Sequence, residues 1–374
     1  MLSGWVIIVA AFAYILLLFA VASYGDRRSR VVGVPKIGRP VVYALSLAIY
    51  CTSWTYFGGV GLASRRGIEF LGIYIGPILM LTLGMPLIRR IVELAKAEKL
   101  TSVADFVAAR YGKNSTVAMI VAIIALVASV PYIALQLKAV SSSVAVMVNP
   151  SDYGIGSGNL HFIDLALIVT LLMAGFAVMF GTRHTDATEH QDGLILAVAM
   201  ESVVKVFAFA TVGLTVLFVL FDGPADLMAK AADNLLITSA LSYETPLSRW
   251  LILILLSAFA ILLLPRQFHV TVVENRTDRE RKVASFLLPI YLVAINLFVL
   301  PVAIAGLVTF GGTGNADLYI LTLPLHGNLP VVTLITFIGG FSAATAMVIV
   351  ESVALSIMVS NDIIIPVFLR RKLM

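Results

Sequence analysis

The chain has 374 residues, of which 60% are hydrophobic and 13% are charged, and its mean hydropathy is +1.00. Soluble globular domains carry about 25% charged residues, so this composition excludes a soluble domain and indicates an integral membrane protein. The single cysteine excludes a disulfide framework, the residue pattern suggests no metal site, and the net charge of +5 needs no nucleic-acid partner to explain it.

Nine apolar segments are each long enough to cross a bilayer, which takes about 20 helical residues. The first segment is too long for the core of a signal peptide and no basic region precedes it, so we expect it to be retained as a helix. The sequence therefore predicts an all-α membrane protein with nine transmembrane helices. The predicted spans are 4–24, 40–63, 70–92, 116–148, 162–180, 193–221, 250–270, 283–308 and 331–359.

Most of the 26 Lys and Arg residues lie on one side of this predicted topology. They fall mainly in the connections after the first, third and seventh spans, and three more follow the last span. By the positive-inside rule, this side is cytoplasmic. The sequence therefore predicts an N-terminus outside and a C-terminus in the cytoplasm.

The second span contains a polar interruption at 49–59, which reads IYCTSWTYFGG. Polar groups at membrane depth are tolerated only where protein or a water-filled cavity satisfies them, which predicts a discontinuous helix whose middle faces inward. The alternative is an unbroken helix whose small and hydroxyl residues pack against neighbouring helices. The seventh span favours the discontinuous helix, because Pro265 stands deep in its apolar run and polar side chains follow directly.

The two interruptions lie in the first helix of each of two possible repeats, one at 40–221 and a partial one of three helices at 248–374. Residues 1–39 form an additional N-terminal helix and a basic loop. Since the seventh span comes five helices after the second, the two interrupted spans cross the membrane in opposite directions. Paired interruptions in inverted repeats indicate the binding site of a transporter.

Several motifs resemble the sodium/solute symporter family, which has the LeuT-like inverted-repeat fold. They are the broken second span, Thr101 to Phe106, Thr185 and Asp186 with Gln191, the Pro265 segment, and Ser360 to Asp362. The stretches TSVADFVAARYG, TDATEHQDG and LPRQFHVTVVEN are more similar to the transporter-like N-terminal modules of CbrA-type bacterial sensor histidine kinases.

This resemblance implies a module in the bacterial cytoplasmic membrane that binds and imports a small amino acid, such as L-histidine. A LeuT-like core has ten helices, so we expect a fragment of a longer sensor, with a kinase domain after Met374 and a response regulator as partner. The alternatives are a plain sodium- or proton-coupled symporter and a receptor that binds without transporting. We do not expect this chain to be an enzyme, because its sequence lacks the metalloprotease, nucleophile-elbow and phosphate-loop motifs.

The resemblance places the substrate near the bilayer midplane, between the ends of the two interrupted helices. Side chains at the interruptions and on the fourth span would then set selectivity. The residues predicted to bind the substrate are Cys51, Thr52, Ser53, Trp54, Phe57, Gln136, Ile261 and Pro265.

The resemblance also implies a site for a coupling ion between the broken second span and the ninth span. Sodium-coupled relatives carry adjacent hydroxyl residues where this chain has Ala346 and Met347, whose methyl and thioether groups are poor ligands for a hard cation. We therefore expect H⁺ in preference to Na⁺, with Glu351 as the proton-binding group, although a carboxylate at Asp186 argues for sodium. The residues predicted to couple the ion are Ile49, Thr52, Asp186, Ala343, Ala346, Met347 and Glu351.

Two opposite charges lie one helical turn apart in the sixth span, at Glu201 and Lys205. Each ionisable residue costs at least about 2.5 kcal/mol at a helix centre, so such residues are functional candidates. The i, i+4 spacing predicts an intramembrane charge pair, either a neutralised structural pair or a gate.

Overall fold

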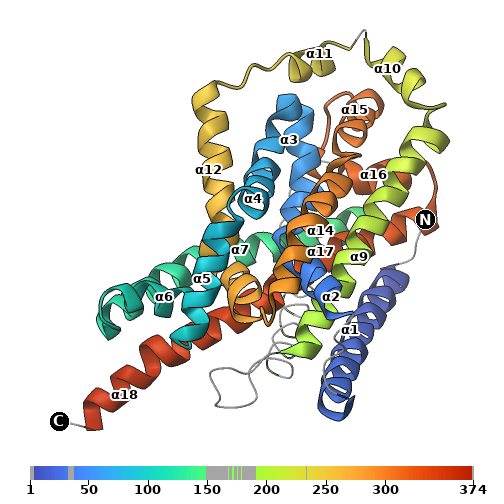
Figure 1. Ribbon diagram of the computed structural model, residues 1–374. Coiled ribbons are helices and arrows are strands. Elements are labelled where there is room, and N and C mark those ends of the chain that lie inside the picture. The colour runs from blue at the N-terminus through green and yellow to red at the C-terminus, as the bar shows by residue number, and fades with distance from the viewer. Residues whose placement is uncertain are drawn as a thin grey trace.

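The computed structural model describes residues 4–32, 38–148, 191–232 and 234–372, together with single helical positions at 167, 171, 175 and 178. All regular secondary structure in this described part is helical (Figure 1). The prediction of an all-α protein is therefore confirmed. The predicted fifth span, 162–180, lies largely outside the described residues.

The first half of the described chain contains ten helical elements. They are α1 (Gly4–Val32), α2 (Arg39–Ser46), η1 (Leu47–Tyr50), η2 (Trp54–Gly58), α3 (Gly59–Arg66), η3 (Gly67–Leu71), α4 (Gly72–Thr82), α5 (Met85–Ala97), α6 (Val103–Arg110) and α7 (Ser115–Val148).

The described elements after residue 190 continue the helical pattern to the last described residue. They are α9 (Asp192–Thr215), η4 (Val216–Leu220), α10 (Pro224–Ala232), α11 (Leu235–Leu241), α12 (Leu247–Leu263), α13 (Pro265–Phe268), η5 (His269–Val273), α14 (Asp278–Asn296), α15 (Val299–Phe310), η6 (Ala316–Leu318), α16 (Tyr319–His326), α17 (Pro330–Met358), η7 (Val359–Ile364) and α18 (Ile365–Lys372).

By length and composition, five single helices of the described chain can cross a membrane, and two bent pairs raise that number to seven. The predicted third span is one of the bent segments, with a change of direction of 68° between Thr82 and Met85. A proline in the first turn of α5 explains the bend, because proline cannot continue the hydrogen bonding of a preceding helix. The five single helices are Trp5–Ser29, Ser115–Met147, Asp192–Leu220, Asp278–Phe310 and Pro330–Phe368.

The second span is interrupted between η1 and η2, within the predicted polar segment. Cys51 is extended, with φ −80° and ψ 94°, and the helix resumes at Trp54. The oxygen of Gln136 accepts a 3.0 Å hydrogen bond from the backbone of Ser53, and the hydroxyl of Thr52 accepts one of 3.3 Å from the backbone of Trp54. Polar side chains thus satisfy backbone groups that the interruption frees inside the membrane.

The seventh span is interrupted between α12 and α13, which are bent by 58°. Leu264 is extended, with φ −67° and ψ 133°, and Pro265 begins the next helix. Proline has no backbone N–H and disfavours helical geometry in the residue before it, so Pro265 accounts for this break.

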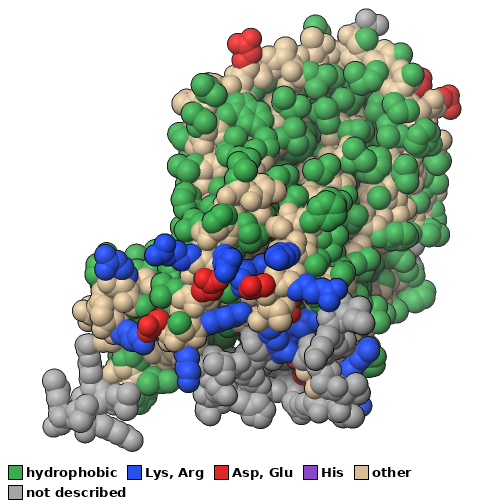
Figure 2. Space-filling view, in the orientation of Figure 1, with side chains coloured by type: hydrophobic (Ala, Val, Ile, Leu, Met, Phe, Trp, Pro, Cys, Tyr) green, Lys and Arg blue, Asp and Glu red, His purple; other side chains and the backbone are tan. Residues whose placement is uncertain are grey.

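Helices α2, α9, α14 and α17 lie together in the centre of the bundle, with α1 packed along α9 (Figure 1). Lys and Arg side chains gather at one end of the molecule, whereas the opposite end, with α10 and α11, shows few of them (Figure 2). We call the former the basic end; it contains Arg39, Lys96, Arg276 and Arg281.

Candidate ligand site at the broken helix

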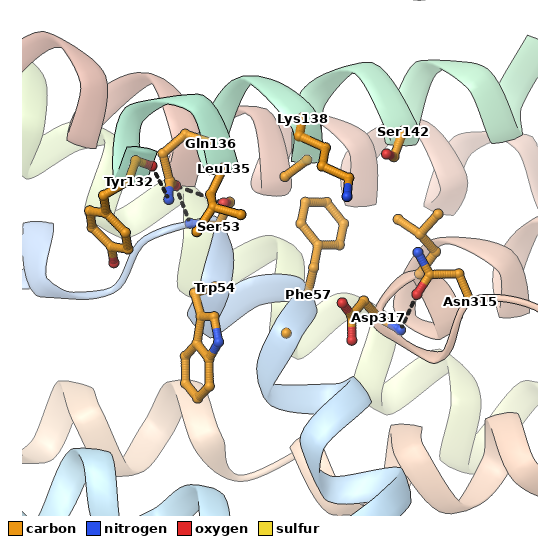
Figure 3. Close-up of a pocket in the computed structure, with 13 residues that line it drawn as sticks. Ser53, Trp54, Phe57, Tyr132, Leu135, Gln136, Lys138, Ser142, Asn315 and Asp317 are labelled. Atoms are coloured by element: carbon orange, nitrogen blue, oxygen red, sulfur yellow. Dashed lines mark hydrogen bonds between the residues drawn. The ribbon is translucent and has the colours of Figure 1, made fainter. Parts of the chain in front are cut away.

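A pocket of about 180 Å³ lies beside the broken second span. Its walls come from η2, α7 and the short turn η6, three segments that are far apart in the sequence (Figure 3). Of the residues predicted to bind substrate, Ser53, Trp54, Phe57 and Gln136 line this pocket. The others do not line it: Cys51 and Thr52 are buried within the first break, and Ile261 and Pro265 are buried at the second.

Gln136 joins the pocket wall of α7 to the broken helix. Its side-chain oxygen accepts hydrogen bonds from the hydroxyl of Ser53 at 2.6 Å and from the backbone of the same residue at 3.0 Å. One turn earlier on α7, the hydroxyl of Tyr132 lies 3.1 Å from that of Thr52. The start of the second half-helix is therefore held at a fixed distance from α7.

Two opposite charges, Lys138 of α7 and Asp317 of η6, point toward one another across the pocket beside Phe57 (Figure 3). Burial raises the pKa of the Asp317 carboxyl, while the positive charges of Arg65 and Lys138 act in the opposite direction. Arg65 Nη2 lies 3.6 Å from Asp317 Oδ1. The pocket thus presents both an anionic and a cationic group to a ligand.

Sequence reasoning missed Asp317, because it lies in a glycine-rich loop with no helical periodicity. The structural signal for its position is Gly61 on α3. A Cβ atom at Gly61 would come 1.7 Å from Asp317 Oδ1, so only glycine leaves room for η6 to approach the broken helix this closely.

Arg266, directly after the second break, forms a buried ion pair with Glu351 of α17. The distance from Arg266 Nη1 to Glu351 Oε2 is 3.0 Å, and Ser129 of α7 donates a hydrogen bond to the other carboxylate oxygen. The guanidinium carbon also lies 4.9 Å from the ring centroid of Tyr132. Glu351 therefore has charged and polar partners that no spacing within its own helix reveals.

Glu201 and Lys205, the predicted charge pair, are both buried and interact electrostatically, but their direct hydrogen bonds are made to other segments. The Lys205 ammonium instead donates to the backbone oxygens of Ala48 and Cys51, at 3.3 and 3.0 Å. The Glu201 carboxylate accepts a 2.5 Å hydrogen bond from Thr345. The i, i+4 spacing predicts that the two charges interact, but it does not reveal these hydrogen bonds, which reach the first break and α17.

The other described residues that were predicted to couple an ion, Ile49, Thr52, Ala343, Ala346 and Met347, are buried in η1, the first break and α17. Ser342 and Thr345 of α17, each next to one of these residues, carry hydroxyls that donate to Glu201, the first to its backbone oxygen at 3.0 Å. Asp186 lies outside the described residues. The fully buried side chains of Ile49, Ala343, Ala346 and Met347 offer no oxygen.

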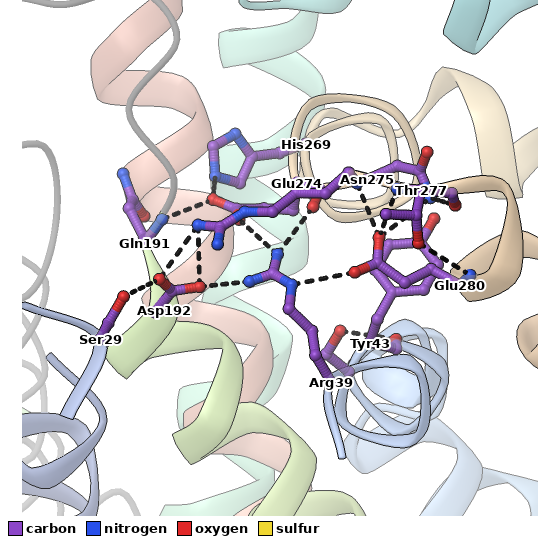
Figure 4. A network of polar contacts seen from close by, with 12 residues as sticks. Ser29, Arg39, Tyr43, Gln191, Asp192, His269, Glu274, Asn275, Thr277 and Glu280 are labelled. Carbon is purple, nitrogen blue, oxygen red and sulfur yellow. Dashed lines mark hydrogen bonds and ion pairs between the residues drawn. The ribbon is translucent and has the colours of Figure 1, made fainter. Parts of the chain in front are cut away.

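A network of charged side chains closes the basic end of the bundle around Arg39 (Figure 4). The guanidinium donates to Glu280 at 3.0 Å and to the backbone oxygen of Glu274 at 3.1 Å, and it pairs with Asp192. Arg276 also contacts Asp192, at 3.0 Å. The network joins the start of α2, the start of α9 and the segment after η5, so it fastens both interrupted helices together at this end.

The arrangement of helices resembles that of a solved membrane transporter. A solved structure of a Na⁺-coupled sialic acid symporter, in a substrate-bound outward-open state with a novel Na⁺ site, matches with a TM-score of 0.64. The match has 14% sequence identity and covers 96% of this chain and 73% of that chain. No protein-family model and no curated protein matches the sequence. The chain is thus an all-α integral membrane protein with a symporter-like fold, and at this identity the match shows the fold alone.

Proposed function

We propose that the chain binds a small zwitterionic amino acid in the pocket between η2, α7 and η6, and imports it by alternating access. The observation that carries the proposal is the pair of opposite charges, Lys138 and Asp317, that face one another across this pocket. A zwitterion would direct its carboxylate to the lysine and its ammonium to the aspartate, in charge-assisted hydrogen bonds. The volume of about 180 Å³ suits a small ligand, since sites for drug-sized molecules are about 300–1,000 Å³.

L-Histidine is the substrate that we propose, on the resemblance to CbrA-type modules. The aromatic ring of Phe57 lies beside Lys138 and Asp317 in the pocket wall and offers a face on which an imidazole would stack (Figure 3). Equilibrium binding of radiolabelled L-histidine to the purified protein in nanodiscs tests this substrate directly. Uptake measured beside binding in the same proteoliposomes separates a transporter from a receptor that only binds.

Competition with histidine analogues tests whether the pocket recognises both the carboxylate and the ammonium group of the ligand. Histamine lacks the carboxylate and imidazole-4-acetate lacks the ammonium, so each should compete at least about tenfold less well than L-histidine, which corresponds to about 1.4 kcal/mol. Lys138→Met and Asp317→Asn should each weaken L-histidine binding by a similar factor. Lys230→Met is the matched control, because this exposed lysine of α10 pairs with Asp226 away from the pocket.

The pH dependence of binding provides a second readout for Asp317. Burial raises the pKa of this carboxyl, so its charge is lost at a higher pH than that of an ordinary aspartate as the solution is acidified. The affinity of the wild type for L-histidine should therefore fall as the pH is lowered through the raised pKa of Asp317. The affinity of Asp317→Asn should lack this decrease. Equal competition by all three compounds, together with unchanged affinity in both pocket variants, would place the site elsewhere.

We further propose that protons drive transport in preference to sodium. The proposal is supported by Ala346 and Met347, which offer no oxygen to a sodium ion, and opposed by the sodium coupling of the structurally similar symporter. Uptake into proteoliposomes should follow an imposed pH gradient and ignore a sodium gradient at equal membrane potential. Accumulation that follows sodium alone would contradict proton coupling.

The proposed setting is the bacterial cytoplasmic membrane, with the N-terminus outside and the basic end in the cytoplasm. The gathering of Lys and Arg at that end supports this orientation through the positive-inside rule (Figure 2). In the sensor proposal, the helical segment from Glu351 of α17 through η7 and α18 to Lys372 leads to a following kinase domain, which would act on a response regulator. A histidine-kinase segment in the reading frame after Met374 would support the sensor, and two further helices followed by a stop would favour a plain symporter.

A further inference from the structure

Lys205 of α9 is fully buried and points its ammonium at the first break. Its Nζ donates hydrogen bonds to the backbone oxygens of Ala48, at 3.3 Å, and Cys51, at 3.0 Å. These two carbonyls lie at the end of the first half-helix, which runs from α2 through η1. The lysine therefore reaches across from a different helix, 154 residues along the chain, to bind the interruption itself.

The end of the first half-helix is a place where a cation is favourable. The last four carbonyl groups of a helix have no partner within it, and the aligned peptide dipoles give that end a partial negative charge. In transporters with interrupted helices, such unwound carbonyls coordinate the coupling cation. Here the carbonyls of Ala48 and Cys51 already accept hydrogen bonds from a cation that belongs to the chain.

A carboxylate and two hydroxyls form a polar cluster beside Lys205. Glu201, one turn earlier on α9, interacts with it electrostatically and is itself fixed by the Thr345 hydroxyl of α17. The Ser342 hydroxyl is also directed to Glu201, through the backbone oxygen. The hydroxyls of Ser342 and Thr345 therefore already have hydrogen-bond partners within the protein.

We propose that Lys205 is a built-in cation of the broken helix, and that its ammonium takes the place of a soluble ion at the carbonyls of Ala48 and Cys51. The geometry of the break then does not depend on sodium. This inference concerns the break and not the ligand, so it holds whether or not the pocket binds an amino acid. Lys205 is a positioning residue that acts through the shape of the half-helices.

Cys51 provides the probe, because it is the single cysteine of the chain and lies fully buried in the break. The rate at which a small thiol reagent modifies it, in nanodiscs without ligand and at fixed pH, reports how often the break opens. In the wild type this rate should be the same in sodium chloride and in choline chloride. Lys205→Ala should raise it by about tenfold in choline, an effect of about 1.4 kcal/mol on the opening.

Adding a soluble cation to Lys205→Ala tests whether the charge of Lys205 positions the break or whether its side chain only contributes packing. Sodium or methylammonium should slow the modification of Cys51 in Lys205→Ala, because either can enter the vacated position, and Lys205→Arg should remain close to the wild type. Lys230→Ala, far from the break, is the control. The proposal is overturned if sodium slows modification of the wild type, or if no cation slows it in Lys205→Ala. The wild-type comparison decides the question even where the alanine variant fails to fold.

Discussion

Replacement of Arg266 by methionine is expected to lower the free energy of unfolding by about 3–5 kcal/mol, because it leaves the carboxylate of Glu351 buried without its counter-charge. Both side chains are almost completely buried, with exposed fractions of 2% and 1%, and the pair is 3.0 Å long. The same guanidinium lies over the ring of Tyr132, and Ser129 donates to the same carboxylate. Arg266 therefore links the second break to both α7 and α17.

A double variant distinguishes the loss of a charge partner from a general loss of packing. Arg266→Met combined with Glu351→Gln should be more stable than Arg266→Met alone, because the uncompensated charge is also removed. Arg89→Met is the control and should have little effect, since its pair with Glu93 is exposed. Reversible unfolding in mixed micelles measures all four proteins. A double variant no more stable than Arg266→Met would show that the charges do not compensate each other.

Glu351→Gln also tests the prediction that Glu351 binds the coupling proton. A carboxyl group that takes and releases a proton during transport can be replaced by glutamine with retention of the fold and loss of pH-driven uptake. A carboxylate that forms the buried ion pair with Arg266 cannot be replaced by glutamine without loss of stability. Glu351→Gln should therefore be assayed for both properties, and the ion pair seen in the structure favours the second outcome.

Both interruptions could be predicted from the sequence because their causes are local. Pro265 cannot continue a helix, and the hydroxyl groups of IYCTSWTYFGG are unfavourable at membrane depth unless protein or water satisfies them. The all-α class followed from composition and segment length alone. The bend before α5 was missed, although a proline at position 86 was available as a local signal.

The partners of buried charges could not be predicted in the same way. Helical spacing showed that Glu201 and Lys205 can meet, but the deciding contacts come from α17 and from the first break. Arg266 and Glu351 are likewise brought together only by the packing of α13 on α17. Asp317 lines the pocket because its loop packs closely against Gly61, where a larger residue would collide with it. Each of these contacts is long-range, so no pattern within one helix contains it.

Replacement of Arg39 by glutamine is expected to open the basic end of the bundle. The buried guanidinium contacts the side chains of Asp192 and Glu280, and it also binds the backbone oxygen of Glu274 at 3.1 Å. The Glu274 carboxylate also lies near the guanidinium, at 3.9 Å, so without Arg39 three carboxylates remain with less compensating charge. Their repulsion favours separation of α2 from α9 and from the segment after η5. In the proposed alternating access, this separation would open the basic end, so the variant should shift the population toward a state open at this end.

The shift can be measured with a cysteine at Ser29, whose hydroxyl donates to Asp192 in the closed network. In a Cys51→Ala background, Arg39→Gln should increase the modification of Ser29→Cys from the basic side by about tenfold, and L-histidine affinity at the pocket should fall together with it. Arg89→Gln, which removes the exposed pair with Glu93, should change neither quantity. Arg276 still contacts Asp192 in the variant, so a complete loss of the closed state is not expected. If the modification of residue 29 is unchanged while the protein is destabilised, the network supports the fold and does not gate the basic end.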